Sequence, residues 1–363
     1  MKRQICCAVP PHIFQYMAEH ADSEHHKALA RRALAYAQTM HADREEETIR
    51  TTLRGDVDLA AGMAGAVAVA APTVVHRRVY TAHNTVKLPG VLVETDGSPG
   101  SKDVAVTEAD HAARATADFY QSVFSRSSVD GHGLALVSTV HYDHQFDNAF
   151  WNGSQMVYGD GDATLFDRFT KCVDVIAHEL THGVTQYTAH LVYHNQPGAL
   201  NESISDVFGS MVKQKTLNQT VTEADWLIGQ GLLIKKPGVD RTALRSMKAP
   251  GTAYNDPTTI GKDPQPAQIS QYKHLPDTQR GDSGGVHINS GIPNKAFYEA
   301  AMGFGGHSWE KAGRVWYATL TSGVLASTAS FADFRDLTVD RAKHLFGSPG
   351  QHVLTSAWAA VGL

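Results

Sequence analysis

Cysteine is scarce in this sequence, and the few cysteines present cannot form a disulfide framework. Only 3 of the 363 residues are cysteine, namely Cys6, Cys7 and Cys172, and the first two are adjacent. Small disulfide-stabilised secreted domains need several spaced cysteines, so this class of protein is excluded.

Neither sign of charge is in large excess. The 32 lysines and arginines against 37 aspartates and glutamates give a formal net charge of −5. Proteins that bind nucleic acids usually present a basic surface, so we expect no nucleic-acid partner. Histidine, in contrast, is well represented with 20 residues, and its imidazole is the commonest metal ligand.

Long hydrophobic runs are also missing. An uncharged stretch rich in Ala and Gly covers the 17 positions 59–75. A bilayer requires about 20 strongly apolar residues, so we expect no membrane span. Pro10-Pro11 interrupts the apolar residues that follow the charged Lys2 and Arg3, which argues against a secretory signal. We therefore expect a cytoplasmic protein, or one secreted by a signal-independent route.

Residues 1–50 show the pattern of a small helical unit. Pro10-Pro11 suits the start of a helix that runs through Glu19, and Ser23 suits the cap of a second helix. Residues 51–76 have only a weak pattern and are interpreted as a connector.

The remaining sequence divides into a β-rich part and a helix-rich part. Val86–Val93 and Leu134–Tyr142 are predicted strands, and a capping box at Thr107 predicts a helix through Phe124. Helical spacing predominates after Asp162, and its three C-terminal stretches are Asn294–Met302, Trp309–Val324 and Phe331–Phe346. This order of elements, without an internal repeat, predicts an α+β fold with two lobes.

Segment Val175–His182 carries the sharpest chemical signal, the sequence Val-Ile-Ala-His-Glu-Leu-Thr-His. On a helix, His178 and His182 share one face and can reach one metal ion, and Glu179 lies beside the first of them. The flanking residues are apolar, so imidazoles without a metal would need other polar partners here. The alternative interpretation is a helix with two core histidines.

A second motif, Asn201–Asp206 (Asn-Glu-Ser-Ile-Ser-Asp), supplies a third ligand. Glu202 follows His182 by 20 residues, which allows a loop to turn back and a second helix to bring the carboxylate to the same ion. Two imidazoles and one carboxylate leave a position open to water, as is typical of a catalytic zinc site. Asp206, one turn beyond Glu202, could accept a hydrogen bond from a ligand histidine. The alternative is a solvated helix face.

Together with three further stretches, these motifs resemble the thermolysin family of zinc metallopeptidases. The matching stretches occur in family order within residues 79–363 and are Asn148–Asp160, His178–His182, Asn201–Asp206, Leu244–Met247 and Gly284–Gly291. The short N-terminal unit most resembles the protealysin branch, whose precursors carry a short propeptide. The resemblance implies a two-lobed thermolysin-like fold with the zinc site between the lobes.

This resemblance also implies four segments. Residues 1–50 would be a helical propeptide and 51–76 a linker that contains the processing site. Residues 77–190 would be the β-rich N-terminal catalytic lobe ending in the zinc-binding helix, and 191–363 the α-helical C-terminal catalytic lobe.

The implied activity is that of a zinc-dependent neutral endopeptidase, made as a proenzyme, with one catalytic Zn²⁺. His178, His182 and Glu202 would bind the ion. Glu179 would take a proton from the attacking water and pass it to the leaving amine. The other implied roles are His287 and Tyr193 as donors to the oxyanion, Asp282 as the residue that orients His287, Arg245 and Asn148 as holders of the substrate backbone, and Ala149 as part of the edge strand that pairs with it.

The family's pocket for the side chain after the scissile bond maps onto five apolar residues, Phe166, Phe169, Val175, Ile228 and Leu244. We therefore expect cleavage on the N-terminal side of bulky hydrophobic residues such as Leu and Phe. Selectivity should be broad, because one methylene in such a pocket is worth only about 1–3 kcal/mol.

The sequence departs from the family at its double calcium site. Asp174 and Asp225 match that carboxylate cluster, but the other positions read Lys213, Leu227 and Gln230. Calcium needs about six to eight oxygen ligands, and an ammonium group repels it. We predict that the double site is absent and that Lys213 pairs with Asp174. The alternatives are that Lys213 points to solvent and that calcium binds at another site.

The expected partners of this chain are polypeptide substrates and its own propeptide, acting as an intramolecular inhibitor. A Cys6 or Cys7 thiolate could bind the zinc, although adjacent cysteines more often pack. We expect a monomer. Two alternatives are an aminopeptidase, whose acidic motif for a free amine we do not find, and a non-catalytic binding protein, which the presence of Glu179 and His287 disfavours.

Overall fold

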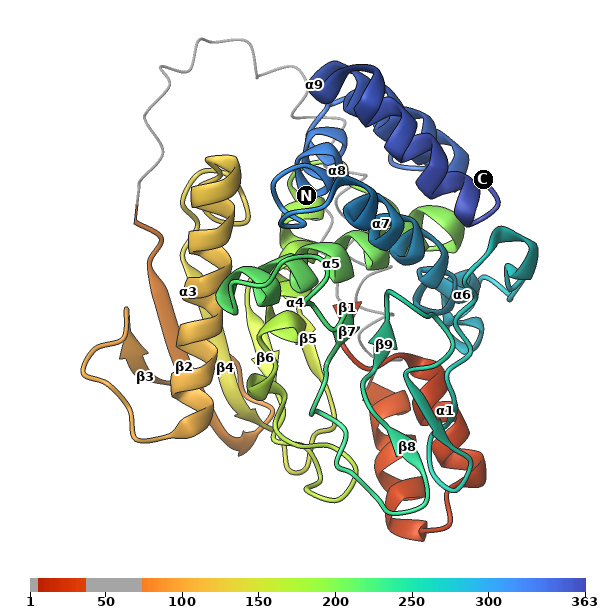
Figure 1. Ribbon diagram of the computed structural model, residues 1–363. Coiled ribbons are helices and arrows are strands. Elements are labelled where there is room, and N and C mark those ends of the chain that lie inside the picture. Colours follow the sequence, from red (N-terminus) through yellow and green to blue (C-terminus); the bar gives the residue numbers. More distant parts are fainter. Residues whose placement is uncertain (1–5, 37–73) are drawn as a thin grey trace, which may run out of the picture.

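The computed structural model describes residues 6–36 and 74–363 (Figure 1). Most of the predicted linker 51–76 and part of the predicted N-terminal unit lie outside these residues.

The N-terminal segment, drawn in red in Figure 1, forms a short strand and two helices. Strand β1 is Cys6–Cys7, helix α1 is Pro11–His20, and residues 24–36 form the second helix. Pro11 occupies the first turn of α1, where its missing N–H costs nothing. The Oγ of Ser23 lies 3.5 Å from the backbone nitrogen of His26. Both predicted helix starts are therefore confirmed.

A six-stranded mixed sheet forms the β-rich part, in the order β1-β5-β6-β4-β2-β3. Its other strands are β2 (Arg77–Thr85), β3 (Val91–Thr95), β4 (Leu136–Tyr142), β5 (Ala149–Trp151) and β6 (Met156–Tyr158). Strand β1 pairs antiparallel with β5. The chain's own N-terminal segment therefore supplies one edge of the sheet.

The predicted strand Val86–Val93 is wrong over its first half. Residues 86–90 form the loop between β2 and β3, and the strand begins only at Val91. At Gly90 the backbone has a φ of 89°, and a Cβ there would lie 2.2 Å from the carbonyl oxygen of Thr81. Only glycine fits such a close turn. The predicted strand Leu134–Tyr142 is confirmed as β4, starting two residues later.

Helix α3 (Val104–Phe124) covers this sheet and begins one turn earlier than predicted. Its N-cap is Asp103, whose carboxylate accepts hydrogen bonds from the backbone N–H groups of Ala105 and Val106. The predicted capping box at Thr107 is therefore wrong. Thr107 lies inside the helix, and its hydroxyl donates back to the carbonyl oxygen of Asp103.

Helices dominate the second half of the chain, as the sequence predicts. They are α4 (Val173–Gln186), α5 (Asn195–Thr216), α6 (Asp282–Asn289), α7 (Gly291–Phe304), α8 (Ala312–Leu320) and α9 (Phe331–Ala360). A 3₁₀ turn, Phe169–Lys171, precedes α4. The short elements between the helices are β7 (Leu227–Ile228), β8 (Asp240–Arg241), β9 (Arg245–Ser246), β10 (Tyr254–Asp256), β11 (Gly261–Lys262) and the 3₁₀ turns Ile269–Gln271 and Gln279–Gly281.

The three predicted C-terminal helices are present with different limits. Trp309–Val324 contains only the shorter α8, whereas Phe331–Phe346 extends to Ala360 as α9. Gly347, with a φ of 68°, breaks the helical geometry inside α9, so the chain turns there and then continues as helix. The predicted α+β architecture, with a β-rich part followed by an α-helical part, is confirmed.

Helices α4 and α5 occupy the centre of the molecule, between the sheet and helices α7 to α9 (Figure 1). Almost every residue of α4 is buried. Within residues 6–36 and 74–363, none of the helices combines the length and the apolar content that crossing a bilayer requires.

An ionic bridge outside this centre fastens α3 to the sheet. His141, near the end of β4, lies between two carboxylates, with Nε2 2.8 Å from Asp103 and Nδ1 2.8 Å from Asp160. The hydrogen bond to Asp160, followed by that to Asp103, raises the pKa of His141 to about 9. A raised histidine pKa stabilises the fold fully below the unfolded value of about 6.5, and this contribution is lost as pH rises through about 9.

Replacing His141 by glutamine should therefore lower the free energy of unfolding at about pH 6 by roughly 1–2 kcal/mol, a figure reduced for solvent screening of the partly exposed carboxylates. The loss should shrink as pH approaches about 10, because the parent imidazole is then neutral. Urea denaturation at both pH values measures this. His111→Gln, on the exposed face of α3, is the control. Equal losses for His141→Gln at both pH values would contradict the assignment.

Candidate active site

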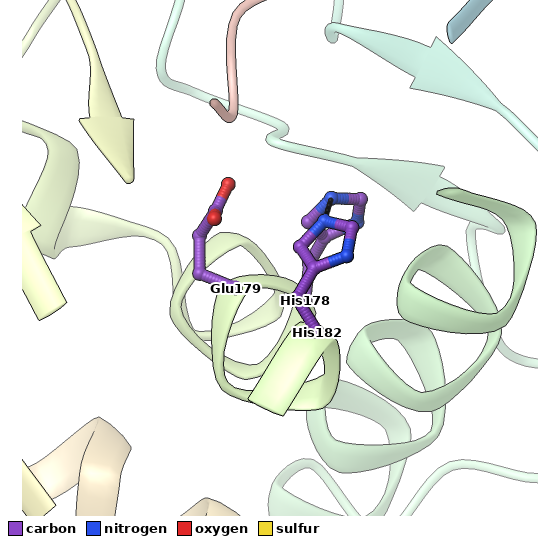
Figure 2. Close-up of side chains that lie close together, drawn as sticks. All are labelled: His178, Glu179 and His182. Carbon is purple, nitrogen blue, oxygen red and sulfur yellow. Dashed lines mark hydrogen bonds between the residues drawn. The ribbon is translucent and has the colours of Figure 1, made fainter. Parts of the chain in front are cut away.

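Helix α4 presents His178, Glu179 and His182 together (Figure 2). All three residues are buried. The two histidines are one helical turn apart, and their Nε2 atoms lie 3.1 Å from each other. Donor atoms from the three residues lie within 4.8 Å of one another, close enough to share one ion.

Helix α5 brings a fourth group, Glu202, to the same point. One carboxylate oxygen lies 3.4 Å from His178 Nε2, and the other lies 3.4 Å from His182 Nε2. The two helices approach closely because α5 carries Gly209, where a Cβ would lie 2.5 Å from the carbonyl oxygen of Asp174 on α4. Any larger residue would push α5, and with it Glu202, away from the imidazoles.

The second ring nitrogen of each histidine is held by α5 as well. His178 Nδ1 lies 2.8 Å from Asp206 Oδ1, while His182 Nδ1 lies 2.9 Å from Asn201 Oδ1 and 3.1 Å from Ser205 Oγ. The carboxylate and amide oxygens require an N–H at Nδ1, which leaves the lone pair on each Nε2 facing Glu202. The roles of Asn201 and Ser205 were not predicted from the sequence. Their spacing of four residues on one helix face, beside Glu202, was the available signal.

These donors fit a zinc ion. Two imidazole nitrogens with fixed tautomers and one carboxylate are the ligand types that zinc takes in catalytic sites. The two Nε2 atoms face each other and the Glu202 carboxylate, so an ion placed between them would satisfy all three groups. Of the two glutamates, Glu202 is the better ligand, because its two oxygens face both Nε2 atoms, whereas Glu179 is oriented by a different element.

Glu179 is held from the neighbouring strand β5. Its Oε2 accepts a hydrogen bond of 3.1 Å from the backbone N–H of Trp151, and its Oε1 is buried with no hydrogen-bond partner in the part of the chain that the structure describes. Burial raises the pKa of Glu179 to about 8. A carboxylate with one free oxygen and a pKa near neutral suits proton transfer. The contribution of Trp151 comes from its backbone, so no side-chain motif could reveal it.

His287, Tyr193 and Asp282 form a second polar group next to Glu202. His287 Nδ1 lies 2.6 Å from Asp282 Oδ1, and its Nε2 lies 3.1 Å from the hydroxyl of Tyr193. That hydroxyl donates to Glu202 Oε1. Burial lowers the pKa of His287, but the carboxylates of Asp282 and Glu202 outweigh it, and the net shift is upward. Both Nε2 and the hydroxyl can therefore donate hydrogen bonds.

The residues expected to hold a substrate backbone hold the chain's own N-terminal segment instead. The backbone N–H of Ala8 donates to the carbonyl oxygen of Ala149 (2.9 Å), and Arg245 Nη1 donates to the Ala8 carbonyl oxygen (3.3 Å). The N–H of Val9 donates to Asn148 Oδ1 (2.9 Å). Strand β1 also contacts α4, so this segment passes beside the polar site.

The five apolar residues expected to line the specificity pocket are all buried: Phe166, Phe169, Val175, Ile228 and Leu244. Phe166 and Phe169 pack with ring centroids 5.7 Å apart, and the N–H of Leu244 donates to the carbonyl oxygen of Ile228. Phe14 of α1 packs against Phe166 with ring centroids 6.4 Å apart. The N-terminal segment thus covers part of this apolar surface.

Comparisons with known proteins identify the family of this chain. Residues 66–186 match the catalytic domain of thermolysin metallopeptidases, and residues 189–363 match their alpha-helical domain. The chain is 45% identical over 365 residues to an extracellular metalloprotease of Pectobacterium carotovorum subsp. carotovorum, covering 99% of this chain and 97% of that protein. It is 49% identical over 288 residues to protease PrtS of Photorhabdus sp. (strain Az29), covering 79% and 76% of the two chains.

A solved structure shows the same architecture. The precursor of protealysin, a metalloproteinase from Serratia proteamaculans, superposes with a TM-score of 0.83 at 43% identity, covering 98% of this chain and 99% of that one. The predicted resemblance to the protealysin branch is therefore confirmed, together with the α+β two-part fold. The chain belongs to the thermolysin family of metallopeptidases.

Proposed function

We propose that this chain is the precursor of a zinc-dependent neutral endopeptidase that cleaves on the N-terminal side of bulky hydrophobic residues. The observation that supports this most is that the buried side chains of His178, His182 and Glu202 lie close enough to share one ion, with Glu179 beside them. His178, His182 and Glu202 would hold the ion. Zinc, when bound, supplies a Lewis acid that polarises the scissile carbonyl and makes water more acidic.

Glu179 would act as the proton carrier. Its unpartnered Oε1 is available to accept a proton from the attacking water, while the N–H of Trp151 keeps Oε2 in place. A carboxyl group with a pKa near neutral can then release the proton to the leaving amine nitrogen. Both transfers use one short side chain, so substrate and water must lie next to Oε1.

His287 and Tyr193 would stabilise the negative charge that develops on the scissile carbonyl oxygen. Asp282 fixes the ring of His287, so that Nε2 points toward the Tyr193 hydroxyl and Glu202. Two such donors, already oriented before the reaction, are each worth a few kcal/mol in the transition state.

Asn148, Arg245 and Ala149 would hold an extended substrate as an added strand on β5. Their present hydrogen bonds to Ala8 and Val9 are of the kind that such a strand would make. These bonds engage backbone only, so side-chain selectivity would come from the apolar residues around Phe166 and Leu244.

We further propose that the N-terminal segment is an intramolecular inhibitor. It uses the substrate-holding groups through Ala8 and Val9, and α1 covers the apolar surface through Phe14. Peptide substrate and segment cannot occupy β5 at once. Release then requires a cut in the chain before Val75, because Val75 is buried in the core and the carbonyl oxygen of His76 already accepts a hydrogen bond from Leu136 of β4.

We therefore propose a cut within the linker 51–76, with residues 1–50 as the propeptide and residues 77–190 and 191–363 as the two catalytic lobes. Inhibition by a cysteine thiolate bound to the zinc would be a second mechanism, independent of the strand pairing. The side chain of Cys6 lies outside the described residues, and Cys7 packs against an apolar cluster that includes Tyr142 and Phe150. Packing is thus the better interpretation for Cys7.

We propose polypeptides as the substrates of a monomeric enzyme. The Pectobacterium relative is named an extracellular metalloprotease, which favours an extracellular over a cytoplasmic location for this chain.

Lys213 takes the place of cations in the region of the family's double calcium site. Its Nζ donates to both carboxylate oxygens of Asp225 (3.0 and 2.9 Å) and to the carbonyl oxygen of Leu227 (3.1 Å), and lies 3.4 Å from Asp174 Oδ2. Asp174 is buried, so its carboxylate needs a positive partner. We propose that this ammonium replaces the double calcium site.

Replacing Glu179 by alanine should abolish casein hydrolysis, with a loss of at least about 100-fold from the missing proton carrier. The purified parent should lose its N-terminal segment on incubation, whereas the variant should stay at full-length mass by mass spectrometry. 1,10-Phenanthroline should stop hydrolysis by the parent, and zinc analysis should find one ion per chain. Identical processing of both proteins, with other proteases absent, would refute autoprocessing; full activity of the variant would refute the role of Glu179.

Cleavage of a randomised peptide library should place Leu, Phe and similar residues directly after the cut bond, because the residues assigned to the pocket are apolar. Sequencing of the products measures the preference. Enrichment of charged residues at that position would end the assignment of the pocket.

Lys213→Met should lower the free energy of unfolding by roughly 2–4 kcal/mol, because the buried Asp174 loses its cationic partner and must either stay charged there or take up a proton. Lys343→Met, on an exposed turn of α9, is the control. Added calcium should raise the melting temperature of the parent very little. A large rise that Asp174→Asn or Asp225→Asn abolishes would show that calcium binds here after all.

A further inference from the structure

Asp206 is the most heavily bonded side chain next to the proposed metal site. Its carboxylate accepts hydrogen bonds of 2.8 Å from His178 Nδ1, from Arg245 Nε and Nη2, and from Asn294 Nδ2. Arg245 and His178 outweigh the effect of burial and lower the pKa of Asp206 to about 2. Four donors use the lone-pair positions of both oxygens, so the carboxylate has one orientation only.

This carboxylate connects two parts of the site. On one side it fixes the tautomer and ring orientation of His178, and on the other it holds the guanidinium of Arg245, which reaches the backbone of Ala8. A rotation of Asp206 would disturb both a proposed zinc ligand and the hold on the peptide.

Asn294 is the remaining donor to Asp206. It lies in the first turn of α7 with its side chain fully buried, and its Nδ2 donates to Asp206 Oδ2. Its Oδ1 is buried and has no hydrogen-bond partner among residues 6–36 and 74–363. An unpaired buried carbonyl costs stability. An apolar residue of similar size would avoid that cost, so stability alone does not account for asparagine here.

We infer that Asn294 is a positioning residue for the metal centre: it locks Asp206 from the side of α7, so that His178 and Arg245 keep their orientation. The inference rests on the proposed zinc site. Among the three side chains that donate to Asp206, Arg245 and His178 both have a second task, toward the peptide and toward the ion. Asn294 comes from another helix, α7, and within the described part of the chain its side chain is hydrogen-bonded to Asp206 alone, so this bond serves to hold that carboxylate.

Asn294→Leu tests this by separating zinc affinity from stability. The substitution removes the donor and also the unpaired oxygen, so the zinc-free protein should unfold within about 2 °C of the parent. Zinc should bind about tenfold more weakly, as expected when a group that orients a ligand is lost. Competition with a chelator of known affinity gives the zinc dissociation constant, and thermal unfolding of the zinc-free protein gives the stability.

Gln214→Leu is the matched control. Gln214 is a buried amide on α5, two turns beyond Asp206, whose partners are Ser210 and Ser308. Its loss should lower the unfolding temperature and leave zinc affinity unchanged. If Asn294→Leu fails to fold, the test uses Asn294→Ala, which also removes the donor but introduces a smaller side chain.

The possible outcomes distinguish failure of the positioning role of Asn294 from failure of the proposed zinc-dependent function. If the parent binds no zinc, the proposed function fails first. If the parent binds zinc and the folded Asn294 variant binds it within twofold as tightly, Asn294 is not a positioning residue and the inference is overturned, while the proposed function stands. A lower unfolding temperature with unchanged zinc affinity has the same meaning.

Discussion

The close packing of α4 against α5 is the constraint on which the site depends. It buries His178, His182 and Glu202 together, where polar groups are costly unless each has a partner. The structure meets that demand with Asp206, Asn201 and Ser205 from α5 and with Asn294 from α7. Buried polar groups in such a network have few alternative arrangements, so the site is rigid before any substrate arrives.

The N-terminal segment satisfies backbone polar groups at the edge of the sheet by pairing with β5. Strand β5 is only three residues long, yet it meets α4 through the bond between Trp151 and Glu179 and meets the N-terminal segment through Ala149. The strand thus joins the proposed proton carrier to the place where a peptide backbone lies. In the described precursor, that place is filled by the chain itself.

The parts of the site that lie within one helix could be predicted from the sequence. The spacing of His178 and His182, and of Glu202 and Asp206, follows directly from helical periodicity, and α+β order followed from the pattern of strands and helices. Tyr193, Arg245 and Asn148 came only from the family resemblance, because their contacts join elements far apart in the chain.

Asn294 and the backbone of Trp151 were missed for the same reason. The start of α3 at its N-cap Asp103 and the loop at Gly90 also differed from the predicted limits. Local hydrogen bonds and close backbone approaches determine such limits.

Strand β5 also sets a limit on which proteins this enzyme can attack. If the N-terminal segment leaves as proposed, the carbonyl oxygen of Ala149 and the amide of Asn148 would bond only to a chain whose own backbone groups are free. Residues inside a stable helix or a central strand already have these groups paired. Intact folded proteins should therefore be nicked first at loops and frayed ends, and digestion should proceed inward only as each cut loosens what remains.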